Sequence, residues 1–222
     1  MDYLLAMALS VVVGYLLGSL PFAMLIAKRF GVDIFKEGSG NPGATNVKRV
    51  LSEKFGKAGK RAGNLCFALD ALKGFLAATW PTWIGAWSMH DTEYQVVGML
   101  AAIVGHSFSI FQRFKGGKGV ATTVGGMLAI TPFVMVLGLV VWLVAFFATG
   151  YVSVASILLG VSLPLTAIIF DHHPHGNDKA LVIILCLLIA VLIVIRHRTN
   201  IQRLQAGTEH KFKRKRHHPK GS

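Results

Sequence analysis

Charged residues are scarce in this sequence, and acidic residues are the scarcest of them. Only 15% of the 222 residues are charged, with 10 Asp and Glu against 23 Lys and Arg, whereas 53% are hydrophobic. The mean hydropathy is +0.56. A soluble domain of this length cannot bury so much apolar surface in one core. The composition therefore predicts a single helical membrane domain, whose basic surface faces anionic lipid instead of nucleic acid.

Cysteine is also rare, which excludes a disulfide framework. The two cysteines, Cys66 and Cys186, each lie within or beside an apolar run. Because unpaired cysteine tends to be buried as a small apolar residue, we expect both to serve in packing.

The long apolar runs predict the membrane spans. These runs are Tyr3–Ala27, Asn64–Trp87, Gln95–Phe111, Val120–Thr149, Val152–Phe170 and Ala180–Ile195. A helix over the whole fourth run would be about 45 Å long, against a hydrocarbon core of about 30 Å. Pro132 cannot continue a helix and pushes Thr131 out of the helical region. The run therefore divides into a short span, Val120–Ile130, and a full one, Pro132–Thr149.

The distribution of basic residues predicts the topology. With seven spans and the N-terminus outside, 21 of the 23 basic residues fall on the cytoplasmic side, and only Lys73 and Lys179 do not. Treating Val120–Thr149 as one span would destroy this asymmetry. We therefore expect an all-α integral membrane protein of seven transmembrane helices, one of them short, with a cytoplasmic C-terminus. Residues 1–210 form the membrane domain, and the basic segment 211–222 forms a disordered cytoplasmic arm on anionic lipid.

Two glycine-rich stretches lie on the predicted cytoplasmic side. They are Gly38–Asn46 (GSGNPGATN) and Lys115–Thr122 (KGGKGVAT). Glycine lets successive backbone N–H groups turn toward one point, and nearby lysine, serine, threonine and asparagine side chains add charge and donors. The second stretch also opens the short span, and a helix N-terminus favours anions. Both stretches predict phosphate binding, although the second could also be a plain glycine hinge.

Three motifs resemble those of the bacterial acyl-phosphate:glycerol-3-phosphate acyltransferase family. They are Ser39–Asn46, then Gly105–Phe108 continuing through Phe114–Thr122, and finally His197 with Asn200–Leu204 and Glu209. The resemblance runs in order along almost the whole chain. It implies a seven-span inner-membrane enzyme that transfers a fatty acyl group from acyl phosphate to the sn-1 hydroxyl of glycerol 3-phosphate, giving lysophosphatidate and phosphate.

The motifs that are missing agree with this resemblance. The sequence has no Gly-x-Ser-x-Gly elbow, and neither cysteine is placed for nucleophilic attack. His106 is not followed by the carboxylate expected of the soluble and CoA-using glycerolipid acyltransferases, because the fifth residue on is Phe111. Gly119 stands where a Walker loop needs Ser or Thr. We therefore expect clamping and alignment without a covalent acyl-enzyme, a nucleotide, a metal or another cofactor.

The residues expected to bind phosphate come from the two glycine-rich stretches and the helix after the first. They are Ser39, Gly40, Asn41, Gly43, Thr45, Asn46, Arg49, Lys115, Gly116, Gly117, Lys118 and Gly119. Ser39 and Lys118 are also candidates for a catalytic role. The alternatives are an Asn-Pro-Gly turn for the first stretch and lipid-headgroup contact for the two lysines. His106 could be a general base or could hold the first loop by a hydrogen bond.

The remaining site residues rest on the resemblance. It places His197 and Asn200 with glycerol 3-phosphate and puts a serine, Ser153 or Ser156, at the pocket wall. We expect Arg203 and Glu209 to form a structural ion pair. The protein would be a monomer whose partners are its two substrates and membrane lipid. The alternative function is a transporter or channel for a phosphorylated anion, which would place its site near the midplane and often contains inverted repeats.

Two further clusters need an explanation. Asp70 and Lys73 lie three residues apart inside a span, and we expect them to neutralise each other in support of the site. The histidines and acids of residues 171–178 could form a metal tract. They lie across the membrane from every motif, so we interpret them as a solvated loop.

Overall fold

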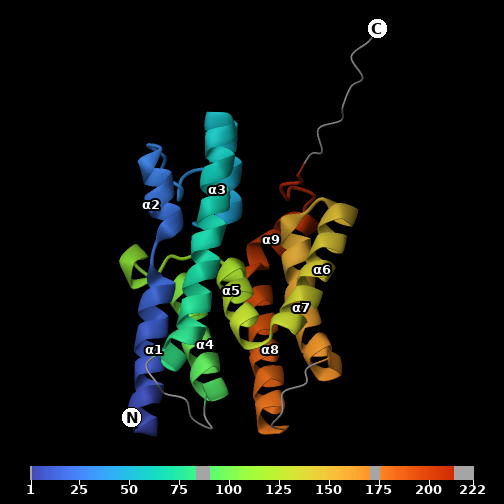
Figure 1. Ribbon diagram of the computed structural model, residues 1–222. Coiled ribbons are helices and arrows are strands. Elements are labelled where there is room, and N and C mark those ends of the chain that lie inside the picture. The colour runs from blue at the N-terminus through green and yellow to red at the C-terminus, as the bar shows by residue number, and fades with distance from the viewer. Residues whose placement is uncertain (1, 84–90, 171–175, 213–222) are drawn as a thin grey trace.

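The regular elements are helices throughout the part of the chain that the structure, a computed structural model, describes: residues 2–83, 91–170 and 176–212. Figure 1 shows their arrangement. In chain order they are α1 (Tyr3–Ser19), α2 (Phe22–Arg29), α3 (Ala44–Trp83), α4 (Asp91–Ser107), the 3-10 turn η1 (Ile110–Gln112), α5 (Val120–Ile130), α6 (Pro132–Thr149), α7 (Val152–Phe170), α8 (Gly176–Arg196) and α9 (Arg198–Gln205).

The predicted break in the fourth apolar run is confirmed. α5 ends at Ile130 and α6 begins at Pro132. Thr131 between them has φ −144° and ψ 80°, outside the helical region, because it precedes proline. The residues Thr122 to Met127 of the short helix α5 are all buried, as expected for a span too short to face lipid alone.

The first predicted span forms one apolar segment, Tyr3–Arg29, but its helix is interrupted. α1 ends at Ser19 and α2 begins at Phe22, with Pro21 at the junction, where proline lacks the N–H that a continuous helix needs. The Lys73 ammonium donates a hydrogen bond of 3.0 Å to the carbonyl of Leu20 and so satisfies one of the exposed backbone groups.

The described part of the second predicted span, residues 64–83, forms only the later part of a longer element, and residues 84–87 lie outside the described residues. α3 contains a non-helical residue, Gly56, with φ 57° and ψ −125°. Only glycine adopts this conformation readily, and the chain folds back there. The residues on either side approach closely, since a Cβ on Gly63 would overlap Lys48 and one on Gly59 would overlap Leu51. α3 is therefore two antiparallel limbs, residues 44–55 and 57–83.

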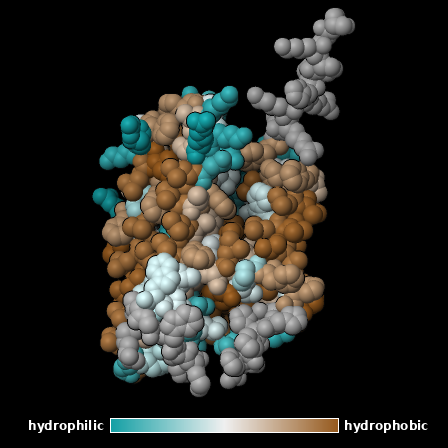
Figure 2. All heavy atoms as spheres, in the orientation of Figure 1, coloured by the Kyte–Doolittle hydropathy of each residue, from teal (hydrophilic) through white to brown (hydrophobic). Residues whose placement is uncertain are grey.

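Within the described ranges, five helical segments are long and apolar enough to cross a membrane. They are Tyr3–Arg29, Asp91–Gln112, Pro132–Thr149, Val152–Phe170 and Asp178–Arg196. Hydrophobic residues cover most of the middle of the face seen in Figure 2, and hydrophilic residues gather at the end formed by α2 and the turn of α3. The chain is thus a multi-pass helical membrane protein by length and composition.

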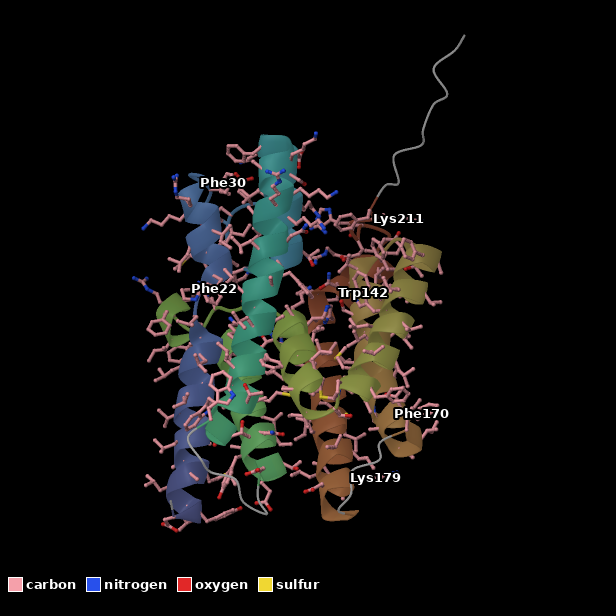
Figure 3. The ribbon with its side chains drawn as sticks, in the orientation of Figure 1. Phe22, Phe30, Trp142, Phe170, Lys179 and Lys211 are labelled. Atoms are coloured by element: carbon pink, nitrogen blue, oxygen red, sulfur yellow. The ribbon has the colours of Figure 1, made fainter. Side chains whose placement is uncertain are left out.

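The helices form two groups with α5 between them. α1, α3 and α4 pack together on one side, α6, α7 and α8 on the other, and α5 contacts α3, α4 and α6 (Figure 1). The N-terminal end of α1 and helix α9 lie toward opposite ends of the helix bundle (Figure 1). Basic side chains follow the same division: Figure 3 places Lys211 toward the α9 end and Lys179 at the other. The segments that carry the three motifs meet beside α9, because residues of all three line one cavity that includes Asn200 of α9.

Candidate active site

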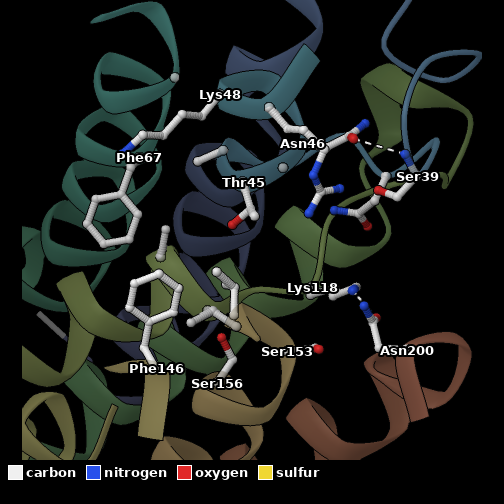
Figure 4. A pocket seen from close by; sticks show the side chains of 18 of the residues that line it. Ser39, Thr45, Asn46, Lys48, Phe67, Lys118, Phe146, Ser153, Ser156 and Asn200 are labelled. Carbon is white, nitrogen blue, oxygen red and sulfur yellow. Dashed lines mark hydrogen bonds between the residues drawn. The ribbon is translucent and has the colours of Figure 1, made fainter. Parts of the chain in front are cut away.

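A cavity of about 830 Å³ brings the predicted motifs together. Figure 4 places Ser39, Lys118 and Asn200 on one side of it and the rings of Phe67 and Phe146 on the other, where the Lys48 side chain also ends beside Phe67. The predicted site residues that line it are Ser39, Asn41, Gly43, Thr45, Asn46, Arg49, His106, Lys118, Gly119, Ser153, Ser156, His197 and Asn200. The apolar side is completed by Val124, Leu139, Trp142, Leu143 and Leu159.

Asn46 holds the first glycine-rich loop in place. Its side-chain oxygen accepts a hydrogen bond of 2.9 Å from the backbone N–H of Ser39, and its amide nitrogen donates one of 3.0 Å to the carbonyl of Glu37. Gly38 and Gly40 have φ of 59° and 68°, which favour glycine. Asn46 thus uses its amide within the loop, and this positions Ser39 at the cavity.

Three helices present their first turns to the cavity. Thr45 of α3, Val120 of α5 and Ser153 of α7 all line it. The first N–H groups of a helix have no partner within the helix, and they carry a partial positive charge. The cavity is therefore favourable to anions even before the side chains are counted.

Lys118 is the central cation of the polar side. Its ammonium donates a hydrogen bond to the side-chain oxygen of Asn200. Burial, with repulsion from Arg203, Arg196 and Arg49, lowers the pKa of Lys118 to about 8, although Glu209 opposes the shift. Lys118 is thus charged at neutral pH, and an incoming phosphate would relieve the cost of burying that charge.

His197 is held as a neutral imidazole. Burial and the nearby Lys118 lower the pKa of His197 to about 4. Its Nδ1 lies 2.7 Å from the carbonyl oxygen of Ile193, which can only accept a hydrogen bond. Nδ1 therefore carries the proton, and Nε2 is an acceptor.

Glu209 connects three elements of the polar side. Its Oε1 accepts hydrogen bonds from Ser153 (2.9 Å) and Asn200 (2.7 Å), and its Oε2 accepts one of 2.9 Å from Arg203. Partial burial disfavours the charged carboxylate, but these three donors outweigh it and hold the pKa of Glu209 below its usual value. The predicted Arg203–Glu209 ion pair is confirmed.

A buried ionic cluster forms part of the cavity wall, because Asp70 and His106 both line it. Asp70 contacts the Lys73 ammonium at 2.9 Å and His106 Nδ1 at 3.6 Å, which confirms the predicted pairing of Asp70 with Lys73. The His106 ring is covered on its other side, because a Cβ on Gly117 would overlap its Nε2, and the Gly117 N–H donates to the His106 carbonyl at 3.0 Å. His106 therefore joins the second glycine-rich loop to Asp70.

Arg196 is a residue that sequence reasoning missed. Its guanidinium donates to the carbonyls of Gly116 (3.0 Å), Gly117 (2.8 Å) and Ser107 (3.4 Å), and it stacks on Phe108 at 5.0 Å from the ring centre. In the sequence analysis Arg196 contributed only to the number of basic residues on the predicted cytoplasmic side. A basic residue directly before His197 was the available signal.

The second glycine-rich stretch is divided between two cavities. Only Lys118 and Gly119 of its predicted phosphate-binding residues line the 830 Å³ cavity. Lys115 is exposed and lines a second, neighbouring cavity together with Gly116 and with Gly40 of the first loop. Gly117 is buried against His106.

Both candidate serines reach the pocket. Ser153 donates to Glu209, and Ser156 accepts a hydrogen bond of 3.3 Å from the Trp142 indole. Trp142, stacked on Phe146 with 5.1 Å between ring centres, joins the apolar side to the polar one. Neither aromatic residue was singled out from the sequence.

The packed part of the chain extends to the start of the predicted basic arm. The backbone N–H of Phe212 donates to the carbonyl of Gly150 at 2.9 Å, and the Phe212 ring lies 5.8 Å from the guanidinium of Arg49. Residues 213–222 lie outside the described residues. So do the histidines of residues 171–175, and the described ranges contain no group of three His, Cys, Asp or Glu that could hold a metal ion.

The sequence was compared with protein families and curated proteins. A family model described as glycerol-3-phosphate acyltransferase matches residues 8–207. A glycerol-3-phosphate acyltransferase of Aquifex aeolicus is 42% identical over 205 residues, which cover 91% of this chain and 97% of that protein. One of Trichlorobacter lovleyi is 40% identical over 200 residues, covering 90% and 94%.

Two solved structures are similar in fold as well. One is the integral membrane glycerol 3-phosphate acyltransferase PlsY (YgiH) in its glycerol 3-phosphate form. It has a TM-score of 0.80 at 38% identity and covers 93% of this chain and 96% of that one. The lysophosphatidic acid form of PlsY has a TM-score of 0.78 at 39% identity and covers 93% and 95%.

Proposed function

This chain belongs to the glycerol-3-phosphate acyltransferase family, and we propose that it transfers a fatty acyl group from acyl phosphate to the sn-1 hydroxyl of glycerol 3-phosphate. The products are lysophosphatidate and inorganic phosphate. The observation that carries this proposal is that Lys118 and Asn200 lie opposite the rings of Phe67 and Phe146 in one cavity. Both substrates carry phosphate, and one carries a long apolar chain, so one such cavity suits both.

The polar side suits the two phosphates. Lys118 and Arg49 supply positive charge, and the first turns of α3, α5 and α7 supply N–H groups. Ser39, Asn41 and Thr45 add side-chain donors. In acyl phosphate the leaving group is phosphate, and negative charge on it increases as its bond to the acyl carbon breaks. Donors fixed in a partly buried site stabilise that charge without having to reorganise.

The apolar side suits the acyl chain. Phe67, Trp142 and Phe146 line it, and Leu139 and Leu143 of α6 continue it. Leu143 is about half exposed on the outer surface of the helix bundle. An acyl chain lying along α6 would therefore remain in contact with lipid while its head is held among the cations.

The reaction requires the glycerol hydroxyl to lose its proton. The hydroxyl oxygen attacks the acyl carbonyl carbon, the bond from that carbon to the phosphate oxygen breaks, and the hydroxyl proton passes to a base. His197 Nε2, as a neutral acceptor, can orient the hydroxyl. His106 would accept the proton with Asp70 holding its ring, or the substrate phosphate would accept it while His106 holds the loop.

The chemistry needs no covalent acyl-enzyme. Cys66 and Cys186 are both fully buried, and neither lines the cavity. Acyl phosphate is a mixed anhydride with a good leaving group, so alignment of the two substrates supplies most of what the reaction needs.

The proposal extends to topology and location. The seven-span arrangement adds α5 and the second limb of α3 to the five long segments, with the N-terminus outside. The motif residues and most of the basic residues then share the cytoplasmic side of the bacterial inner membrane. This gives the water-soluble substrate access from the cytoplasm.

A release assay tests the proposal. Purified protein in detergent with acyl phosphate and glycerol 3-phosphate should release inorganic phosphate and form lysophosphatidate in equal amounts, and EDTA should not change the rate. Acyl-CoA in place of acyl phosphate should give little product. Equal activity with acyl-CoA, or loss of activity in EDTA, would contradict the proposed donor and mechanism.

A further inference from the structure

A second cavity of about 600 Å³ adjoins the proposed active site. Its wall is formed by the first glycine-rich loop, by the segment from Phe108 to Lys118, and by the junction of α8 and α9. It shares four lining residues with the first cavity: Ser39, Asn41, Lys118 and Arg203. The two spaces therefore meet at Ser39, Asn41 and Lys118, which the proposed chemistry uses, and at Arg203, which is paired with Glu209.

The charge of the second cavity is of one sign. Its lining includes five cations, Lys115, Lys118, Arg196, Arg198 and Arg203, and none of its lining residues is acidic. The first cavity, in contrast, contains the carboxylates of Asp70 and Glu209.

Two of the five cations have no ion-pair partner among the described residues. Arg196 is bonded to backbone carbonyls, Arg203 to Glu209 and Lys118 to Asn200. Lys115 and Arg198 are exposed, and neither forms an ion pair with any residue that the structure describes. They form an unpaired positive rim, which attracts anions over a distance set by ionic strength.

Hydrogen bonds to α1 hold the segment from Phe108 to Lys115 in place. The Ser109 hydroxyl donates to the carbonyl of Ser19 at 2.6 Å, the Tyr15 hydroxyl to that of Phe108 at 2.9 Å, and the Phe114 N–H to that of Ser109 at 2.8 Å. Phe114 has φ of 60°, a left-handed conformation that is unfavourable for a non-glycine residue. The bonds to α1 maintain this shape, so the cavity is a fixed feature of the fold.

We propose that the second cavity is the binding site at which small water-soluble phosphates enter and leave the active site. Glycerol 3-phosphate binds first at Lys115 and Arg198 and then passes the shared residues Lys118 and Arg203 into the first cavity. Inorganic phosphate leaves by the same way. The acyl chain uses the apolar side of the first cavity, so the two substrates arrive by different routes. This inference rests on the proposed function, since it assigns a path to that function's soluble substrate and product.

Thr199 offers a direct probe of this cavity. It lines the second cavity but not the first, and it is exposed. The native cysteines are fully buried, so a Thr199→Cys variant carries one reactive thiol among the described residues. Thr208→Cys is the matched control, because Thr208 is exposed close by and lines neither cavity.

The thiol reaction rates test the charge of the cavity. A methanethiosulfonate bearing a sulfonate should react faster than one bearing a trimethylammonium group, and this ratio should be at least fivefold larger at Thr199→Cys than at Thr208→Cys. Inorganic phosphate and glycerol 3-phosphate should each slow the sulfonate reagent at position 199 but not at position 208. Equal ratios at the two positions, or protection by lysophosphatidate alone, would overturn the proposal.

Steady-state kinetics provide a second test of the proposed entry site. Arg198→Gln and Lys115→Gln should each lower kcat/KM for glycerol 3-phosphate about threefold to tenfold at low ionic strength, and the difference should shrink as salt is raised. The KM for acyl phosphate should not change. Lys57→Gln is the control, because Lys57 is exposed and outside both cavities.

The two proposals can fail separately. If the wild-type protein does not transfer an acyl group from acyl phosphate, the proposed function is wrong. An active wild type whose kcat/KM for glycerol 3-phosphate is the same in Arg198→Gln, Lys115→Gln and Lys57→Gln refutes the entry site alone.

Discussion

At the scale of single residues, Lys118 is the side chain whose charge depends most closely on its surroundings. It lies between the first turn of α5 and Asn200, partly buried among three arginines. Arg49 approaches the same cavity from α3, with its guanidinium over Phe212. The two cations differ in geometry, because a lysine is a point charge and an arginine is a planar fork.

Removal of either cation should weaken the clamp. Lys118→Ala or Arg49→Ala removes a charge-assisted contact worth about 1.5–3 kcal/mol, so kcat/KM should fall at least tenfold. Arg49→Lys should recover little of the lost kcat/KM, because lysine lacks the planar guanidinium that can form two parallel hydrogen bonds to phosphate. Steady-state kinetics with both substrates varied would test this. Near-wild-type efficiency in Arg49→Lys would mean that only the charge matters.

The pKa of Lys118 predicts a pH dependence. Its pKa of about 8 in the free protein means that the ammonium is charged below pH 8 and neutral above it. A bound phosphate favours the charged form, so affinity is full below pH 8 and falls as pH rises through that value. A phosphate monoester becomes a dianion near pH 6. The KM for glycerol 3-phosphate should therefore be lowest near pH 7, begin to rise before pH 8 and increase steeply above it.

Lys118→Arg is the matched control for this pH profile. Its guanidinium stays charged over the whole range, so the rise of KM above pH 8 should disappear even if the rate is lower. His197, whose pKa is about 4, remains neutral across this range and adds no step. A rise that persists unchanged in Lys118→Arg would assign the titration to another group.

His106 has two possible roles that kinetics can separate. If it is the general base, His106→Ala should lower kcat on the order of a hundredfold or more with little change in the KM for glycerol 3-phosphate. If it holds the loop through Gly117 and Asp70, the KM should rise and the melting temperature should fall together. A near-normal kcat would assign the proton to substrate phosphate or water.

At the scale of elements, α5 depends on close contact with α3. Gly125 faces Ala71 and Gly74 faces Thr122 so closely that a Cβ on either glycine would overlap a backbone oxygen. Small residues let membrane helices approach to this distance, and dispersion forces then replace the hydrophobic effect that lipid does not supply. This contact sets the height of Gly119 and Lys118 relative to α3.

Gly125→Ala should therefore push α5 away from α3. Backbone cannot move aside as a side chain can, so we expect a loss of about 1–3 kcal/mol, seen as a lower melting temperature in detergent, with reduced activity. Gly138→Ala is the control, because the nearest atom there is the flexible end of Leu163, and alanine improves helix propensity. Equal melting temperatures in the two variants would contradict the close packing of α5.

At the scale of the whole molecule, both ends of the helix bundle can be labelled. The proposed topology places Lys57 and Thr208 on the cytoplasmic side and Thr92 and Lys179 outside. Single cysteines at the first two positions should react with an impermeant thiol reagent only from the cytoplasmic side. Those at the last two should react only from outside. Labelling of positions 57 and 208 from opposite sides would refute both the seven-span arrangement and the common site.

Some features follow from the sequence alone because they depend on local chemistry. Pro132 lies in an apolar run too long for one span, so a break there, and with it the bounds of α5 and α6, could be predicted. Proline alone does not decide this, since Pro164 lies inside α7. The same reasoning was not applied to Pro21, and the break between α1 and α2 was missed. The glycine-rich loops and their cations were also recognisable, because glycine and lysine in that order suit phosphate in any fold.

Other features depend on which segments meet in space, and only the tertiary structure decides that. Gly56 turns α3 back on itself, which brings Arg49 and Phe67 of the two limbs to one cavity. Arg196 was counted by its charge, but its role comes from the carbonyls of a loop about 80 residues away. The division of Lys115 and Lys118 between two cavities follows in the same way. Sequence spacing limits local backbone conformation, whereas contacts between distant segments depend on the packing of the whole bundle.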